Sequence, residues 1–89
     1  MSASKLREVR NPAAVAWEWT DRYEGFDSEY RHAITWIRGT HSLSYGTSVD
    51  GRPWVNVAID RPERFGFDGT LKSARAAAHA FVSDGTVAL

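Results

Sequence analysis

Cysteine is absent from this chain of 89 residues, so neither disulfide bonds nor thiolate metal ligands can stabilise it. Net charge is also absent, because 11 acidic residues balance 11 basic ones, and no global positive field attracts nucleic acid or an anionic membrane. No apolar run approaches the roughly 20 residues of a membrane span. The polar start, MSASKLREVR, lacks the apolar segment of a signal peptide. We therefore expect a cytoplasmic protein with no membrane partner.

Catalytic motifs are lacking as well. The sequence has no Gly-x-Ser-x-Gly elbow, no phosphate loop and no dinucleotide fingerprint. The three histidines, His32, His41 and His79, are dispersed without the spacing of metal ligands. His32 falls on an inward position of a predicted strand, which favours a hydrogen-bonded structural histidine over a ligand. We expect no enzymatic activity, no cofactor and no metal site.

Residues 1–10 are polar and predict a flexible arm, after which the pattern favours a helix. Asn11 followed by Pro12 is typical of a helix N-cap with proline in the first turn. The predicted helix runs from Pro12 to about Glu24, and its core stripe recurs every four residues at Val15, Trp19 and Tyr23. Trp17 then points away from the core. This position favours a partner-binding anchor, with packing beneath the arm or against a loop as the alternative.

A three-stranded antiparallel meander is predicted next, with strands at Tyr30–Arg38, Ser42–Ser48 and Pro53–Asp60. A two-residue turn at Gly39-Thr40 sets Trp36 opposite Leu43 and Ile34 opposite Tyr45. For the second turn we favour a bulged loop over Val49–Gly51, which sets Tyr45 opposite Val55, over a two-residue Asp-Gly turn. The bulged loop keeps apolar residues together on one face.

The other face of this meander is flat and weakly polar, and we expect it to be open. Its predicted partner-binding residues are Thr35, Ser44, Asn56 and Trp54. Trp54 is expected to lie over Gly46, either as cover for the glycine or as part of a contact face. A short fourth strand at residues 64–67 is a further alternative.

Thr70 is predicted to cap a final helix from Leu71 to about Ser83, with an alanine-rich apolar stripe that packs on the sheet. One flank of this helix carries Lys72, Arg75 and His79. These side chains could bind phosphate groups, or they could form an ordinary solvated flank.

The segment GRPWVNVAIDRPERFGFDGTLKSARAAAHAF, residues 51–81, resembles the strand-strand-strand-helix pattern of the plant ethylene-response-factor DNA-binding domain and of the arm-binding domains of tyrosine integrases. The resemblance implies DNA contact from the sheet face away from the helix, here through Arg52, Trp54 and Arg64. Asn56, Ala58 and Asp60 depart from the basic pattern. The order of elements is also similar to that of the double-stranded-RNA-binding domain, without its basic loop. The overall style resembles small orphan proteins of actinobacteria and their phages.

The sequence therefore predicts one α+β domain over residues 11–89: a helix, a three-stranded antiparallel meander with an optional fourth strand, and a C-terminal helix. We expect a non-enzymatic protein-interaction module that forms a homodimer or higher oligomer, binds a cellular or host protein, or does both. The alternative function is nucleic-acid binding through the open sheet face and the basic helix flank. Its residues would be Arg52, Arg64, Lys72, Arg75 and His79.

Overall fold

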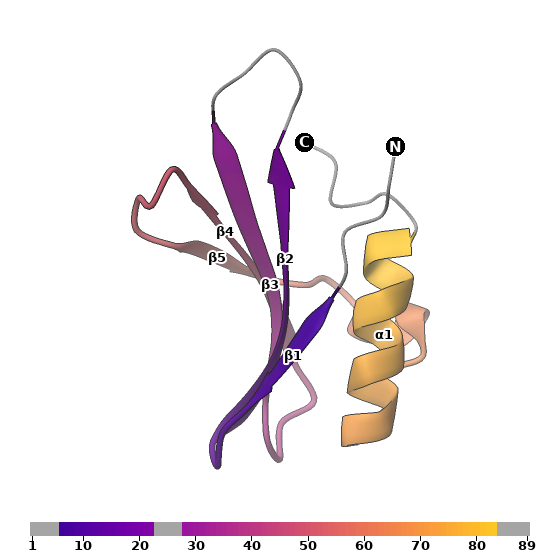
Figure 1. Cartoon of the computed structure of the whole chain (residues 1–89). Helices are drawn as coiled ribbons and strands as arrows, with labels where there is room; N and C mark the ends of the chain where they lie inside the picture. Colours follow the sequence, from indigo (N-terminus) through magenta and orange to yellow (C-terminus); the bar gives the residue numbers. More distant parts are fainter. Residues whose placement is uncertain (1–5, 23–27, 84–89) are drawn as a thin grey trace.

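The computed structural model describes residues 6–22 and 28–83 and has an α+β architecture. A five-stranded antiparallel sheet has the strand order β1-β2-β3-β4-β5, so each strand pairs with its neighbour in sequence. The strands are followed by a short 3-10 helix, η1, and by the single described α-helix, α1 (Figure 1). Their bounds are β1 Arg7–Arg10, β2 Ala14–Arg22, β3 Glu29–Ile37, β4 Leu43–Val49, β5 Val55–Ala58, η1 Pro62–Phe65 and α1 Leu71–Ser83.

The first predicted helix is wrong, because its residues form strand β2. Val15, Trp17 and Trp19 alternate along this strand, and all three are buried on the same face. A spacing of four residues, which suggested a helix, also fits a strand, since four is a multiple of the strand period of two. Trp17 is the residue that discriminates, because it fits only the period of two. Tyr23 and Glu24 lie outside the described residues.

Asn11 caps a hairpin turn rather than a helix. Its Oδ1 accepts hydrogen bonds from the backbone N–H groups of Ala13 and Ala14, both at 2.8 Å, and its own N–H donates to the Ala14 carbonyl. Asn-Pro is equally typical of the start of a β-turn. The turn pairs β2 with β1, so the predicted flexible arm is wrong for residues 7–10. Residues 1–5 lie outside the described part of the chain.

The predicted register between β3 and β4 is confirmed, with Ile34 opposite Tyr45 and Trp36 opposite Leu43. The predicted register of β5 is wrong by two residues, because Tyr45 pairs with Val57. Asp50 and Gly51 both have positive φ in the turn, as the disfavoured two-residue hairpin requires, and an irregularity follows before Val55. A two-residue shift leaves every side chain on its predicted face.

The C-terminal helix is confirmed at Leu71–Ser83. Thr70 caps it, with its Oγ1 accepting a hydrogen bond from the Ser73 N–H at 3.2 Å. Residues 64–67 form part of η1 and the following turn, so the optional fourth strand there is wrong. The core lies between the sheet and the helix and includes Val15, Trp17, Trp19, Ile34, Trp36, Leu43, Ile59, Phe67, Ala74, Ala77, Ala78 and Phe81.

Candidate functional site

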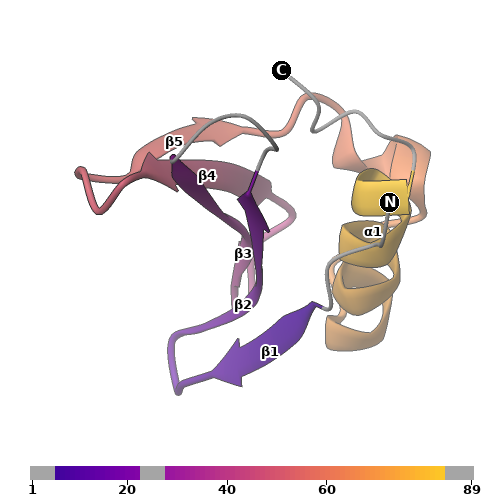
Figure 2. The same ribbon diagram turned by 45° about the horizontal axis from the view of Figure 1, so that its top comes forward.

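The two faces of the curved sheet differ in what covers them. Helix α1 and η1 lie on one side of the sheet (Figure 2). Two contacts fix α1 there: Arg75 reaches Glu8 of β1, and the ring of Phe81 lies 5.8 Å from that of Tyr45 of β4. Strand alternation then places the small and polar side chains of β2 to β5 on the opposite face. No helix or strand of the described residues covers this face, which we call the open face.

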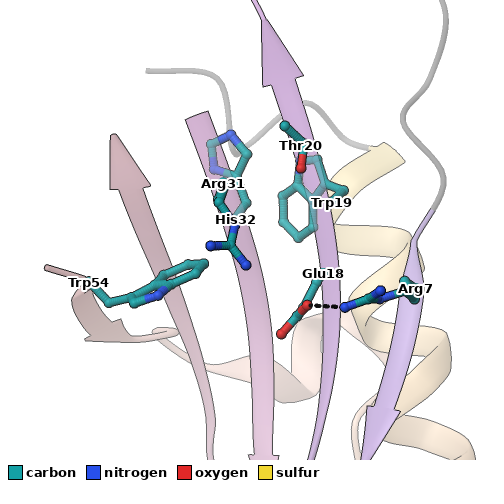
Figure 3. A pocket seen from close by; sticks show the side chains of 7 residues that line it. All are labelled: Arg7, Glu18, Trp19, Thr20, Arg31, His32 and Trp54. Atoms are coloured by element: carbon teal, nitrogen blue, oxygen red, sulfur yellow. Dashed lines mark hydrogen bonds and ion pairs between the residues drawn. The ribbon is translucent and has the colours of Figure 1, made fainter. Parts of the chain in front are cut away.

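A groove of about 450 Å³ crosses one end of the open face (Figure 3). It is lined by Arg7, Glu18, Trp19, Thr20, Arg31, His32 and Trp54. Arg7 and Glu18 form an ion pair at 3.4 Å, with the arginine side chain 77% exposed. Across the groove, the guanidinium carbon of Arg31 lies 5.6 Å from the centre of the Trp54 ring. The groove thus contains two cations, one anion and an aromatic face.

Trp54 is the exposed aromatic of this site, with 38% of its surface accessible. It also lies over Gly46 as predicted, since a Cβ atom built on that glycine would be 3.4 Å from Trp54 Cε3. One edge of the ring therefore lies next to the glycine, while the ring remains accessible beside Arg31. A partly exposed indole stacked with a guanidinium combines two residue types that are enriched at binding hot spots.

A second depression of about 270 Å³ lies toward the other end of the open face. Its lining includes the predicted residues Thr35, Ser44 and Asn56, together with Ile37 and Ala58. The structure therefore places Trp54, Thr35, Ser44 and Asn56 on one surface.

Trp17, the fifth predicted partner-binding residue, does not belong to this surface. It is 1% exposed, and its indole Nε1 donates a hydrogen bond to Glu8 Oε1 at 2.8 Å. The prediction that it anchors a partner assumed the phase of a helix, and in a strand the side chain points into the core.

Glu8 links the first strand to the last helix. Its carboxylate accepts two hydrogen bonds from Arg75, at 2.7 and 3.0 Å, and one from Arg10 at 2.7 Å. The Arg75 and Arg10 bonds hold the pKa of Glu8 well below its usual range, and the Trp17 bond adds to them. Arg75 therefore already has a carboxylate partner, which weakens its predicted role as a phosphate ligand.

The remaining basic residues of the predicted nucleic-acid site are dispersed. Lys72 and His79 are exposed on α1, on the side of the sheet away from the open face. Arg52 is exposed beside the β4–β5 turn. Arg64, in η1, donates to the Asp60 carbonyl at 3.1 Å and lies over the Phe65 ring. Lys72 and His79 therefore do not share a surface with the open face, whereas Arg52 borders it, because the Arg52 carbonyl accepts a hydrogen bond from Ser48 Oγ on that face.

A chain of polar groups centred on one buried histidine lies on the helix side of the sheet. His32 is 1% exposed; its Nε2 lies 3.1 Å from Asp21 Oδ2, and its Nδ1 lies 2.7 Å from Tyr45 Oη. Because a carboxylate only accepts, the proton of the neutral ring belongs on Nε2, and Nδ1 accepts from the tyrosine hydroxyl. Burial lowers the pKa of His32, while the negative charge of Asp21 acts in the opposite direction. His32 also stacks on Trp19 at 4.9 Å, which fits the predicted structural role.

Of the groove residues, sequence reasoning assigned only Trp54 to a site, and the charged residues Arg7, Glu18 and Arg31 were missed. Glu18 was placed on a helix, and Arg7 was assigned to the arm. Arg31 could have been found, since strand alternation places it on the same face as Thr35, which was assigned correctly.

No protein-family model, curated protein or solved structure matches this chain. In residues 6–22 and 28–83, no helix is both long and apolar enough to cross a membrane. Within the same ranges, no group of three His, Cys, Asp or Glu side chains is placed to hold a metal ion.

Proposed function

We propose that the protein is a non-enzymatic interaction module that binds a protein partner through the open face of its sheet. One observation carries this proposal: the open face combines an accessible tryptophan, stacked with an arginine, with a surface of small side chains that no described element covers. A flat surface of small side chains allows close approach of a partner, and the Trp54–Arg31 pair supplies a central anchor.

The charges of the groove favour a partner segment that carries a carboxylate. Arg7 is paired with Glu18, while Arg31 is held against an uncharged ring. The groove therefore has an excess of one positive charge. A partner carboxylate placed near Arg31 would gain a charge-assisted hydrogen bond in a partly desolvated site.

The test is quantitative affinity capture from the source cell with three baits: the wild type, Trp54→Ala and Arg31→Ala. Lys72→Ala is the matched control, because Lys72 is exposed on the side of the sheet away from the open face. We expect one protein to be enriched by the wild type and the control and reduced at least about tenfold with either open-face variant. Equal recovery with all four baits would contradict the proposal.

Single-stranded nucleic acid is the second candidate, favoured by the Arg31–Trp54 pair alone, because bases stack on exposed aromatic rings. The zero net charge and the Glu8–Arg75 ion pair disfavour it. We expect no binding tighter than the roughly 10⁻⁴–10⁻⁶ M of non-specific association at physiological salt. Submicromolar binding that weakens steeply with salt and is lost in Trp54→Ala would promote this candidate over the first.

A further inference from the structure

We propose that strand β5 is a dimerisation edge, which pairs antiparallel with β5 of a second copy of this chain. The inference goes beyond the proposed function, because it uses the edge of the sheet rather than its open face. Strand β5 is the last strand of the sheet, and no described strand lies beyond it (Figure 1).

The backbone of β5 has hydrogen-bonding groups directed outward. The Ile59 N–H donates to the Leu43 carbonyl of β4 at 2.8 Å, so the odd-numbered residues of this strand face β4. Because residues alternate in direction along a strand, the N–H and C=O groups of Asn56 and Ala58 face away from β4. They offer a ladder that another strand can complete.

The side chains of β5 carry no charge that would oppose such pairing. Its sequence, VNVA, carries no charge, and Val55 and Val57 are 66% and 57% exposed. Sheets commonly protect their edges with charged residues, and β1 follows that rule with the sequence REVR. The β5 edge lacks this protection.

Charge complementarity identifies a second copy as the occupant and fixes the register. Arg52 precedes β5 and Asp60 follows it; both side chains are exposed, although Asp60 also lies 3.5 Å from Arg61. If Asn56 lies on the two-fold axis, opposite its counterpart, the end of β5 next to Arg52 in each copy meets the end next to Asp60 in the other. The same register places Val55 against Val57 of the second copy. Such a contact is self-complementary, as a two-fold interface requires.

The β1 edge is the other exposed edge of the sheet, and its charges are not self-complementary. Antiparallel pairing of β1, REVR, with its own copy would bring Arg7 of each copy near Arg10 of the other, and these like charges repel. Pairing through β5 instead joins two five-stranded sheets into one continuous sheet.

The first measurement is light scattering of the full chain after gel filtration at about 100 µM. We expect a mass near twice the 9.9 kDa of one chain. Arg52→Glu or Asp60→Arg alone converts two attractive contacts into two repulsive ones, and should weaken dimerisation about tenfold. The double variant Arg52→Glu/Asp60→Arg restores the complementarity and should recover most of the loss. Lys72→Glu makes the same charge change as Arg52→Glu on α1, and should leave the dimer unchanged.

The second measurement locates the contact. Because the chain has no cysteine, Asn56→Cys supplies a unique thiol at the proposed two-fold axis. We expect a short bifunctional maleimide to cross-link this variant efficiently, and to leave the β1 control Val9→Cys mostly uncross-linked. A monomer at 100 µM, preferential cross-linking of Val9→Cys, or no recovery in the charge-swapped double variant would overturn the proposal. The two proposals can fail separately. Dimerisation is tested by the variants at Arg52 and Asp60, whereas capture of a partner by the open face is tested by the variants at Trp54 and Arg31.

Discussion

The two edge strands have four residues each, yet the rest of the fold contacts them differently. Strand β1 is tied to α1 through Glu8 and Arg75, and Trp17 packs behind it. Strand β5 has valines on the same face of the sheet, and they remain more than half exposed. Figure 2 shows the reason, because α1 lies along the β1 side of the curved sheet and away from β5. Alternation determines which face a side chain is on, and the position of the helix determines whether that face is buried.

The largest expected effect is on the free energy of unfolding, when the tryptophan near each edge is replaced in turn. Trp17→Ala should lower the free energy of unfolding by about 3–5 kcal/mol, because it removes a large buried side chain beside β1. Trp54→Ala, next to β5, should cost less than about 1.5 kcal/mol, because the ring is 38% exposed. Urea melts of both variants measure the difference. Equal losses would show that the β5 side is packed as tightly as the β1 side.

A smaller effect concerns the charge at the β1 edge. Glu8→Gln should lower stability at neutral pH by about 1–2 kcal/mol, because two arginines lose a charged acceptor. The pKa of Glu8 is lowered by folding, so the unfolded chain binds more protons as the pH falls below about 4.5. The contribution of Glu8 is therefore present above this pH and lost in acid. Melts between pH 3 and 7 should show a wild-type loss that Glu8→Gln lacks.

A separate acid effect is expected at His32, one strand further toward β5 than Trp17. Burial lowers its pKa from 6.5, so the unfolded chain takes up a proton at a higher pH than the folded protein does. Stability should therefore decline as the pH falls below about 6.5, less than for Glu8 because Asp21 opposes the effect of burial. His32→Gln should remove this decline and retain the one below pH 4.5. A pH profile that is flat from 7 to 5 in the wild type would contradict the assignment.

The smallest effect tests the exposed face of β5. Val57→Thr should change stability by less than about 0.5 kcal/mol in monomeric protein, because the side chain is 57% exposed. Val15→Thr is the matched control on β2, and should cost about 1–3 kcal/mol because it buries a hydroxyl group. Thermal melts at low concentration check the pair. A large loss at Val57 would mean that the β5 valines belong to the core.

The sequence predicted the parts of this fold that depend on local chemistry. Thr70 caps α1 as predicted. The short turn near Gly39 gave the correct β3–β4 register, with Ile34 opposite Tyr45. It did not predict β2, because an Asn-Pro start and a four-residue spacing are compatible with both a helix and a hairpin. Burial of Trp17 and Trp19 in the core that the sheet shares with α1 decides between them, and that long-range packing is not encoded in any short window.

The candidate site was predictable only in part. Thr35, Ser44, Trp54 and Asn56 were placed together because the predicted meander puts each side chain on the correct face, even though the register of β5 was wrong by two residues. Glu18 and Arg7 come from strands that were not recognised, so their half of the groove was missed. The exposure of Val55 and Val57 could not be foreseen either, because it depends on where α1 lies along the sheet.

The bond between Glu8 and Arg75 joins residues that are 67 positions apart, whereas all sheet pairings connect neighbouring strands. Closing a long loop has an entropic cost that local hairpins avoid, so the meander can form early and the docking of α1 comes late. An interaction that forms after the transition state affects mainly the rate of unfolding. We therefore expect Arg75→Ala to accelerate unfolding in stopped-flow experiments and to leave the refolding rate nearly unchanged. The ion pair would then act as a latch, which determines how long the folded state persists rather than how quickly it is reached.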